Sequence, residues 1–282
     1  MRVIVTRPEN SAHSWALGLE QAGFEPVLLP LIAIRPMEMT QVLQQTWAKL
    51  ADYAAVMFVS GAAVKNFFAS KPDFADVLLK ESAIETRAWA TGPGTMRILL
   101  RCGVDASLLD APALDADQFD SEALWNVVRH RVKAGTRVLI VRGAETAGRT
   151  PQTALQTAAD AALEGAAESA TMGSGRDWFA RQLTDAGVLV DFVVAYQRSA
   201  SELSAEQQDI ARTAVSDGSV WLLSSSEAIA NLAAGMPGQD WQNARAVVTH
   251  PRIASQARKL GFGVVCESRP VLASVIASIE SM

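Results

Sequence analysis

Three segments of this chain occur twice and in the same order. RVIVTR at 2–7 returns as RVLIVR at 137–142, VMFVSGAAVKNFF at 56–68 returns as WLLSSSEAIANL at 221–232, and RAWATGP at 87–93 returns as RAVVTHP at 245–251. Recurrence of three segments in one order indicates a duplication, which predicts two similar lobes. A cleft between two such lobes is a usual place for a small-molecule site.

Short apolar runs alternate with helical patterns along the whole chain, which predicts the α/β class. Several runs are apolar at successive positions, as in strands of a parallel sheet that helices cover on both faces. The expected strands are 3–6, 27–34, 55–59, 88–91, 138–141, 190–196, 220–223, 246–249 and 264–266. Helices are expected at 11–22, 62–69, 95–102, 121–133, 227–234 and 253–260. Gly23, Gly103, Gly187 and Gly261 follow helical segments and are expected to be left-handed C′ residues.

Two of the apolar runs are unusually long. Glu25–Pro36 and Val188–Ala200 would each extend for roughly 40 Å at ~3.3 Å per residue, and Pro30 interrupts the first of them. We interpret both as crossovers between lobes, near 27–37 and 189–200. The first lobe is then discontinuous, with residues 1–33 and 202–282, and the second lobe is 38–193.

An Ala-, Thr-, Ser- and Gly-rich stretch at 152–175 does not fit this pattern. Its composition provides little apolar side-chain area to bury. We expect a surface insertion or a loose, solvent-facing helix, without a function of its own.

The net charge of −5 carries no basic excess, so the composition does not favour nucleic-acid binding. No run approaches the ~20 apolar residues that cross a bilayer, and no polybasic block indicates a membrane surface. The start of the chain is expected to be a buried strand and a turn, not a signal peptide. Cys102 and Cys266, far apart, are expected to be reduced and buried. The expected location is the cytoplasm.

In open α/β sheets, ligands bind beyond the carboxyl ends of the strands. The turns expected there are small, hydroxylic or glycine-containing, and most lead directly into a helix, whose first N–H groups favour carboxylate or phosphate. Ser60, Thr95 and Ser226 could each serve only as helix N-caps. The expected ligand-binding residues are Arg7, Ser60, Gly61, Ala62, Gly92, Pro93, Gly94, Thr95, Arg142, Ser224, Ser225, Ser226, His250, Pro251 and Arg252.

Common catalytic signatures are missing from the sequence. It contains no G-x-G-x-x-G after the first expected strand, no G-x-x-x-x-G-K-[ST] and no G-x-S-x-G. His13, His130 and His250 lack metal-ligand spacing. We therefore expect neither a cofactor nor a metal.

Taken together, the motifs resemble the uroporphyrinogen-III synthase family, nearly from end to end and excluding the Ala-rich stretch. No single motif is specific, but their order is. The matching segments are VIVTRP (3–8), Trp15, Leu19, Gly23 and Phe24, LLPLIAIRP (28–36), Phe58–Val64, Ala90–Thr95, Gln118–Leu124, Val138–Gly143, Val193–Arg198, Leu222–Ile229 and His250–Ala254.

The resemblance implies two α/β lobes joined by a two-stranded β ladder, with the cleft between them. It also implies a cofactor-independent lyase that cyclises hydroxymethylbilane to uroporphyrinogen III, with loss of water and inversion of ring D. The family is thought to use an azafulvene and a spiro intermediate. The substrate carries eight carboxylates, so positioning should supply much of the catalysis. Delivery by hydroxymethylbilane synthase and a monomeric state are further expectations.

Within this family, the favoured acid for the leaving hydroxide is a Tyr at the position of Tyr196. A neutral phenol can donate a proton, but Tyr196 could also pack on the ladder with its hydroxyl in water. Gly61 stands where the family often has Pro, and His250 where it often has Gly; His250 could add a cation or cap a helix. Two other functions stay open: a non-catalytic two-lobed protein that binds an anionic small molecule, and a degenerate half of a tetrapyrrole-pathway fusion.

Overall fold

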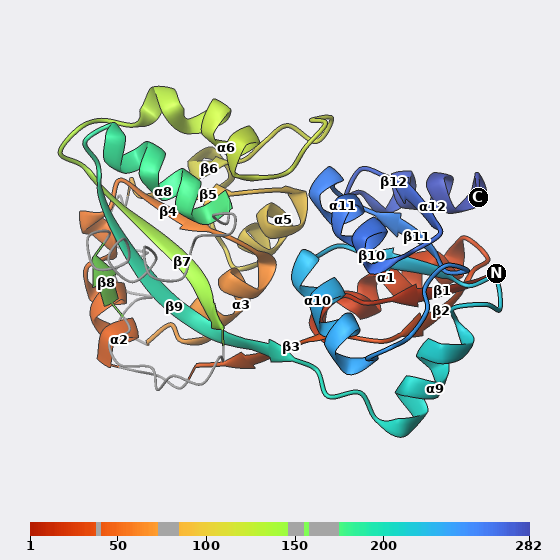
Figure 1. Cartoon of the computed structure of the whole chain (residues 1–282). Helices are drawn as coiled ribbons and strands as arrows, with labels where there is room; N and C mark the ends of the chain where they lie inside the picture. Colours follow the sequence, from red (N-terminus) through yellow and green to blue (C-terminus); the bar gives the residue numbers. More distant parts are fainter. Residues whose placement is uncertain (38–40, 73–84, 146–154, 158–174) are drawn as a thin grey trace. The chain divides into compact units, whose positions relative to one another are not determined.

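The computed structural model describes residues 1–37, 41–72, 85–145, 155–157 and 175–282. The chain forms two compact units: unit 1 contains Met1–Ile34 and Arg198–Met282, and unit 2 contains Arg35–Gln197 (Figure 1). Both boundaries fall inside strands, β3 (Ile32–Pro36) and β9 (Leu189–Ala200), which are neighbours in one sheet.

Unit 1 is built on a five-stranded sheet in the order β12-β11-β10-β1-β2, in which every neighbouring pair is parallel. Its strands are β1 (Arg2–Val5), β2 (Glu25–Leu28), β10 (Val220–Leu223), β11 (Arg245–Val248) and β12 (Val264–Glu267). Its helices are α1 (Glu9–Gln21), α9 (Ala205–Thr213), α10 (Ser226–Gly235), α11 (Pro251–Leu260) and α12 (Leu272–Glu280).

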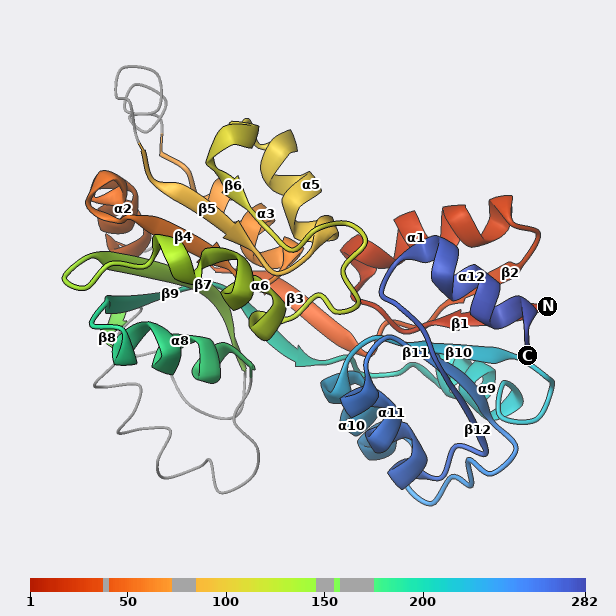
Figure 2. The same ribbon diagram turned by 90° about the horizontal axis from the view of Figure 1, so that it is seen from above.

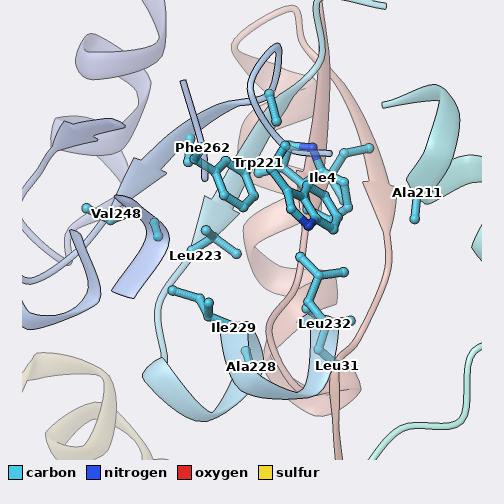
Figure 3. Close-up of a cluster of buried hydrophobic side chains, with 14 of the residues drawn as sticks. Ile4, Leu31, Ala211, Trp221, Leu223, Ala228, Ile229, Leu232, Val248 and Phe262 are labelled. Carbon is cyan, nitrogen blue, oxygen red and sulfur yellow. The ribbon is translucent and has the colours of Figure 1, made fainter. Parts of the chain in front are cut away.

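Helices cover both faces of this sheet, with α1 and α12 on one face and α10 and α11 on the other (Figure 2). Side chains of β1 and β10 alternate between the two faces, and all residues of β10 are buried. Figure 3 shows Trp221 and Leu223 beside Ile229 and Leu232 of α10. The continuous apolar runs in the sequence are explained by this burial on two sides.

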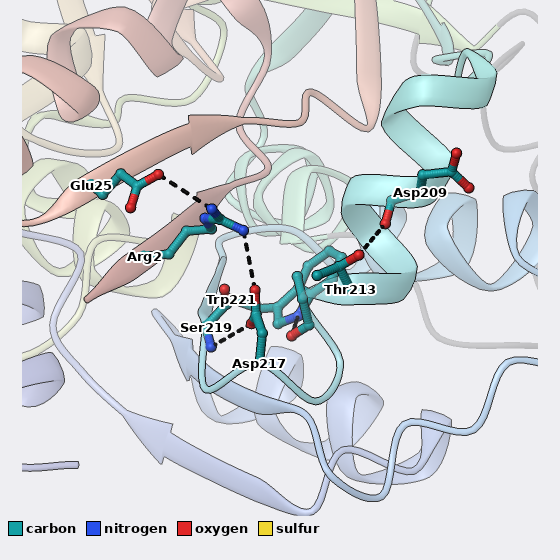
Figure 4. Close-up of polar contacts among 8 residues, drawn as sticks. Arg2, Glu25, Asp209, Thr213, Asp217, Ser219 and Trp221 are labelled. Carbon is teal, nitrogen blue, oxygen red and sulfur yellow. Dashed lines mark hydrogen bonds and ion pairs between the residues drawn. The ribbon is translucent and has the colours of Figure 1, made fainter.

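At the amino-terminal edge of the unit 1 sheet, an arginine forms ion pairs with two carboxylates (Figure 4). Arg2, at the start of β1, contacts Asp217 at 3.1 Å and Glu25 at 3.4 Å. The other carboxylate oxygen of Asp217 accepts a hydrogen bond from the Ser219 backbone N–H. The positive charge of Arg2 is therefore compensated by Asp217 and Glu25.

Unit 2 is built on a seven-stranded sheet in the order β3-β9-β7-β4-β5-β6, with β8 also paired to β9. The pairs β4–β7, β4–β5 and β5–β6 are parallel, and β8–β9 is antiparallel. Its further strands are β4 (Ala55–Phe58), β5 (Arg87–Ala90), β6 (Leu109–Asp110), β7 (Arg137–Glu145) and β8 (Leu155–Thr157). Its α-helices are α2 (Gln41–Ala48), α3 (Gly61–Ala69), α5 (Pro93–Arg101), α6 (Ser121–Val128) and α8 (Gly175–Asp185). Short 3₁₀ helices are η1 (Leu50–Asp52), η2 (Ala106–Leu108) and η3 (Arg129–Arg131).

Two buried carboxylates connect elements of unit 2. Asp191 of β9 accepts hydrogen bonds from Arg137 Nη2 at 2.6 Å and from the Tyr53 hydroxyl at 3.0 Å. Burial and the Asp191 carboxylate raise the pKa of Tyr53 above its ordinary value. Asp110 of β6 accepts hydrogen bonds from both Arg87 and the Trp89 indole N–H.

The two sheets repeat one arrangement of strands. Read from β12, unit 1 has the order β12-β11-β10-β1-β2, and unit 2 has β6-β5-β4-β7-β9 followed by β3. The sequence repeats match β1 to β7, β4 to β10 and β5 to β11. Each unit therefore combines the first strands of one repeat with the last strands of the other, because the chain leaves each unit along a crossover strand.

The α/β class and the parallel sheets are confirmed. Pro30 separates β2 from β3, as expected. The four glycines expected after helices all have positive φ, from 78° at Gly187 to 107° at Gly261. For 152–175 we expected a surface insertion or a loose, solvent-facing helix. Leu155–Thr157 instead form β8, which pairs with β9, and Gly175 begins α8. Residues 152–154 and 158–174 lie outside the described part of the chain. Among the described residues, no helix has the length and apolar character to span a membrane.

Candidate functional site

Within each unit, parallel pairing brings the expected turns to one edge of the sheet. In unit 1, Arg7 follows β1, Ser224–Ser226 follow β10, and His250–Arg252 follow β11; these strands are neighbours. In unit 2, Ser60–Ala62 follow β4 and Gly92–Thr95 follow β5. Each carboxyl edge thus collects small or hydroxylic turns that lead into helices, as the sequence predicts.

Tyr196 of β9 is buried, with 3% of its surface exposed, so its hydroxyl is not simply in water. The Tyr196 hydroxyl lies 3.1 Å from Ser60 Oγ. Its ring packs against the backbone of Gly143 in β7: a Cβ added at Gly143 would lie 2.4 Å from Tyr196 Cε2 and 2.6 Å from Cζ. Strand β9 therefore supplies the phenol, and Gly143 of β7 leaves room for its ring. Ser60, directly after β4, supplies a hydroxyl as hydrogen-bond partner.

The expected helix caps are only partly confirmed. Ser60 is the N-cap of α3, and its Oγ accepts a hydrogen bond from the Ala63 N–H at 3.2 Å. Thr95 and Ser226 lie inside α5 and α10, so they are not N-caps. The caps are instead Gly92 and Ser225, neither of which makes a side-chain capping bond. The first N–H groups of α5 and α10 are therefore not satisfied by a capping side chain.

Arg7 is one of the cations at the carboxyl edge of unit 1. Its guanidinium lies over the ring of Trp15 in α1, 4.6 Å from the ring centroid, and its Nε is buried with no hydrogen-bond partner among the described residues. Burial lowers the pKa of Arg7 to about 10, which still leaves it charged at neutral pH. Arg7 keeps part of its surface exposed, so it can pair with an anionic ligand.

The other two arginines are placed differently. Arg142 was expected at the end of its strand, but β7 continues to Glu145, so Arg142 lies within the strand. Its guanidinium is 4.7 Å from the ring centroid of Phe192. Arg252 is exposed in the first turn of α11.

His250 caps a helix. It is the N-cap of α11, and its Nδ1 accepts a hydrogen bond from the Arg252 backbone N–H at 3.1 Å. The sequence left two roles open for His250, a cation at the site or a helix cap. The structure shows the helix cap.

Gly143 and Phe119 lie in segments named from the sequence but were not among the expected ligand-binding residues. An isolated glycine inside an apolar strand can mark a close approach of another group, and this was a usable signal for Gly143. A Cβ at Gly92 would lie 3.0 Å from the Cβ of Phe119, so the segment before α6 lies against the Gly92 turn. No spacing rule could have indicated that contact.

No group of three or more His, Cys, Asp or Glu residues that could hold a metal ion occurs within the described ranges. Cys102 and Cys266 are free but only partly buried, which corrects the expectation of core positions. Burial raises the pKa of the Cys102 thiol. The arrangement at both carboxyl edges offers hydroxyls, backbone N–H groups and arginine, which suit carboxylate ligands.

Comparison with known proteins gives consistent results. The family model for uroporphyrinogen-III synthase HemD matches residues 13–159 and 170–277. A uroporphyrinogen-III synthase from Chlorobaculum parvum is 32% identical over 154 residues, a region that spans 53% of this chain and only 56% of that protein.

Two solved structures share the fold. A mutant uroporphyrinogen III synthase from Thermus thermophilus has a TM-score of 0.55 at 13% identity, with 100% of this chain and 98% of that chain covered. The uroporphyrinogen-III synthetase from Helicobacter pylori 26695 has a TM-score of 0.58 at 12% identity, with 100% and 99% covered. These identities support the two-lobed fold alone, whereas the family model covers most of the sequence. The chain belongs to the uroporphyrinogen-III synthase family.

Proposed function

We propose that this chain cyclises hydroxymethylbilane to uroporphyrinogen III, with loss of water and inversion of ring D. The observation that carries the proposal is the family match over residues 13–159 and 170–277, which includes all the expected ligand-binding residues except Arg7. The domain division expected from the sequence, 1–33 with 202–282 and 38–193, is part of this proposal, as are a cytoplasmic monomer and delivery of the substrate by hydroxymethylbilane synthase.

The carboxyl edges suit the charge of this substrate. A linear tetrapyrrole with eight carboxylates needs many anion-binding groups, and N–H groups at helix N-termini bind anions without adding titratable charge. The ligand set we propose is Arg7, Ser60, Gly61, Ala62, Gly92, Pro93, Gly94, Thr95, Arg142, Ser224, Ser225, Ser226, His250, Pro251 and Arg252. That the substrate lies between the lobes stays a prediction from the sequence.

Tyr196 is the proposed acid. Its buried hydroxyl can give a proton to the hydroxyl that leaves the substrate, because C–O cleavage requires the oxygen to depart as water. The azafulvene that remains, in its N-protonated (azafulvenium) form, is then attacked by the substituted carbon of ring D. Holding the flexible chain in the folded shape for this attack supplies the selectivity, since the uncatalysed reaction closes the ring without inversion.

Isomer analysis tests the function. Freshly generated hydroxymethylbilane is incubated with the protein, the products are oxidised to porphyrins, and the isomers are separated by chromatography. Isomer III above the background without protein is the expected result. Isomer I alone, at the spontaneous rate, would leave a non-catalytic binding protein as the better description.

A further inference from the structure

The two tyrosines of this chain have hydroxyls in opposite environments. The Tyr53 hydroxyl donates to the Asp191 carboxylate, an arrangement that disfavours the phenolate and raises the pKa of Tyr53. The Tyr196 hydroxyl instead lies 3.1 Å from the neutral Ser60 hydroxyl, at the N-terminus of α3. The Tyr196 oxygen therefore has a hydroxyl beside it that can act as a donor, whereas the Tyr53 oxygen faces a carboxylate that can only accept.

The bonding of Ser60 leaves its proton available. Ser60 Oγ already accepts the Ala63 N–H at 3.2 Å, so its lone pair completes the cap of α3 while its O–H can donate. The Tyr196 oxygen lies within hydrogen-bond distance of that O–H. A hydrogen bond from a hydroxyl to a phenolate is charge-assisted and therefore stronger than the bond to the neutral phenol. The N-terminal end of α3 favours negative charge at the same place.

We propose that Ser60 and Gly143 are positioning residues for Tyr196. Gly143 holds the ring in place, because any larger side chain would overlap it, and Ser60 donates its O–H to the Tyr196 oxygen as the phenolate forms. This inference rests on the proposed function, which supplies the reaction that takes the proton from Tyr196.

The proposed step conserves protons and electrons. The bond between the hydroxymethyl carbon and its oxygen breaks with the electron pair on oxygen, which takes the Tyr196 proton and leaves as water. The pyrrole nitrogen lone pair completes the azafulvenium cation, and the phenolate stays bound to the Ser60 O–H. When ring closure is complete, the pyrrole carbon that formed the last bond loses a proton, and this proton restores the Tyr196 phenol.

The first test is a double-mutant cycle between Ser60 and Tyr196. We expect Ser60→Ala to lower kcat by no more than Tyr196→Phe does, a factor of several, and by more than it raises KM. Ser60→Thr should restore most of the lost kcat. Residues that act as a unit are non-additive, so Ser60→Ala should have no further effect in Tyr196→Phe. Ser204→Ala is the matched control, because Ser204 caps α9 through a similar bond to the Gln207 N–H. It should leave kcat unchanged.

A second readout does not depend on activity. Because the chain has two tyrosines, incorporation of fluorotyrosine gives two ¹⁹F resonances, and Tyr53→Phe assigns them. Ser60→Ala should shift the Tyr196 resonance, whereas Ser204→Ala should not. The proposal would be overturned if the decreases in kcat caused by Ser60→Ala and Tyr196→Phe multiplied in the double variant. It would also be overturned if Ser60→Ala left the Tyr196 resonance unmoved. Wild-type protein that forms no isomer III would instead refute the proposed function, while the ¹⁹F shift would still report on the hydrogen bond.

Discussion

Replacement of Gly143 by alanine would place a methyl group closer to the ring atoms of Tyr196 than van der Waals contact allows. The added Cβ would lie 2.4, 2.6 and 3.0 Å from Cε2, Cζ and Cδ2. Carbon atoms in contact are ordinarily ~3.5–4.0 Å apart, so ring or backbone must move by about 1 Å. Tyr196 is 3% exposed and has little room to move. Overpacking of this kind costs about 1–3 kcal/mol, and the movement separates the phenol from Ser60 Oγ.

The measurement is urea unfolding of Gly143→Ala together with its kcat for isomer III. We expect an unfolding free energy lower by about 1–3 kcal/mol and a kcat at or below that of Tyr196→Phe. Gly235→Ala is the matched control, since Gly235 is the last residue of α10, where an added Cβ would meet only Leu203 Cδ1 at 3.6 Å. Alanine there should be neutral or stabilise by about 0.4–1 kcal/mol.

The steric reasoning has its own check. In a Tyr196→Ala background the cavity accepts the new methyl group, so Gly143→Ala should cost little further stability. If Gly143→Ala alone is as stable as the wild type and leaves the Tyr196 ¹⁹F resonance unmoved, the described contact between β7 and β9 is wrong.

Three further predictions concern the two tyrosines and Arg7. Tyr196→Phe should slow turnover several-fold while isomer III remains the product; unchanged steady-state kinetics would remove Tyr196 from the mechanism. Arg7→Met should raise KM for hydroxymethylbilane with little change in kcat, because it removes a positive charge at the carboxyl edge of unit 1. Since the pKa of Tyr53 is raised in the folded protein, the unfolded chain loses that proton first, at about pH 10. Stability should therefore fall as pH rises above about 10, and Tyr53→Phe should flatten that decline in pH-dependent unfolding.

Local signals in the sequence predicted much of the fold. Burial on two faces of a parallel sheet produces runs such as Val3–Val5, and these located the strands. Pro30 marked the break between β2 and β3, because a proline cannot donate to a strand ladder. Helix α9 was not named, although Ser204 and Gln207 form a capping box that was a readable signal.

The candidate site was predictable only in part. The turns at the carboxyl edges follow from strand–helix alternation, so residues such as Ser60 could be named from local pattern. The contact of Gly143 with Tyr196 depends on how β7 and β9 lie beside each other, which no local pattern specifies. Arg142 was misplaced because β7 extends beyond its apolar run to Glu145. The stacking of Arg7 on Trp15 likewise depends on where α1 packs, not on the motif around Arg7.

The central claim is that the hydroxylic turns at the carboxyl edges hold the carboxylates of the tetrapyrrole. A crystal structure with bound uroporphyrinogen III or its oxidised porphyrin tests it most directly. The account predicts carboxylates within hydrogen-bond distance of the helix N-termini at 60–62, 92–95, 224–226 and 250–252. A ligand bound instead at the amino-terminal edges, near Arg2 or Arg137, would contradict it.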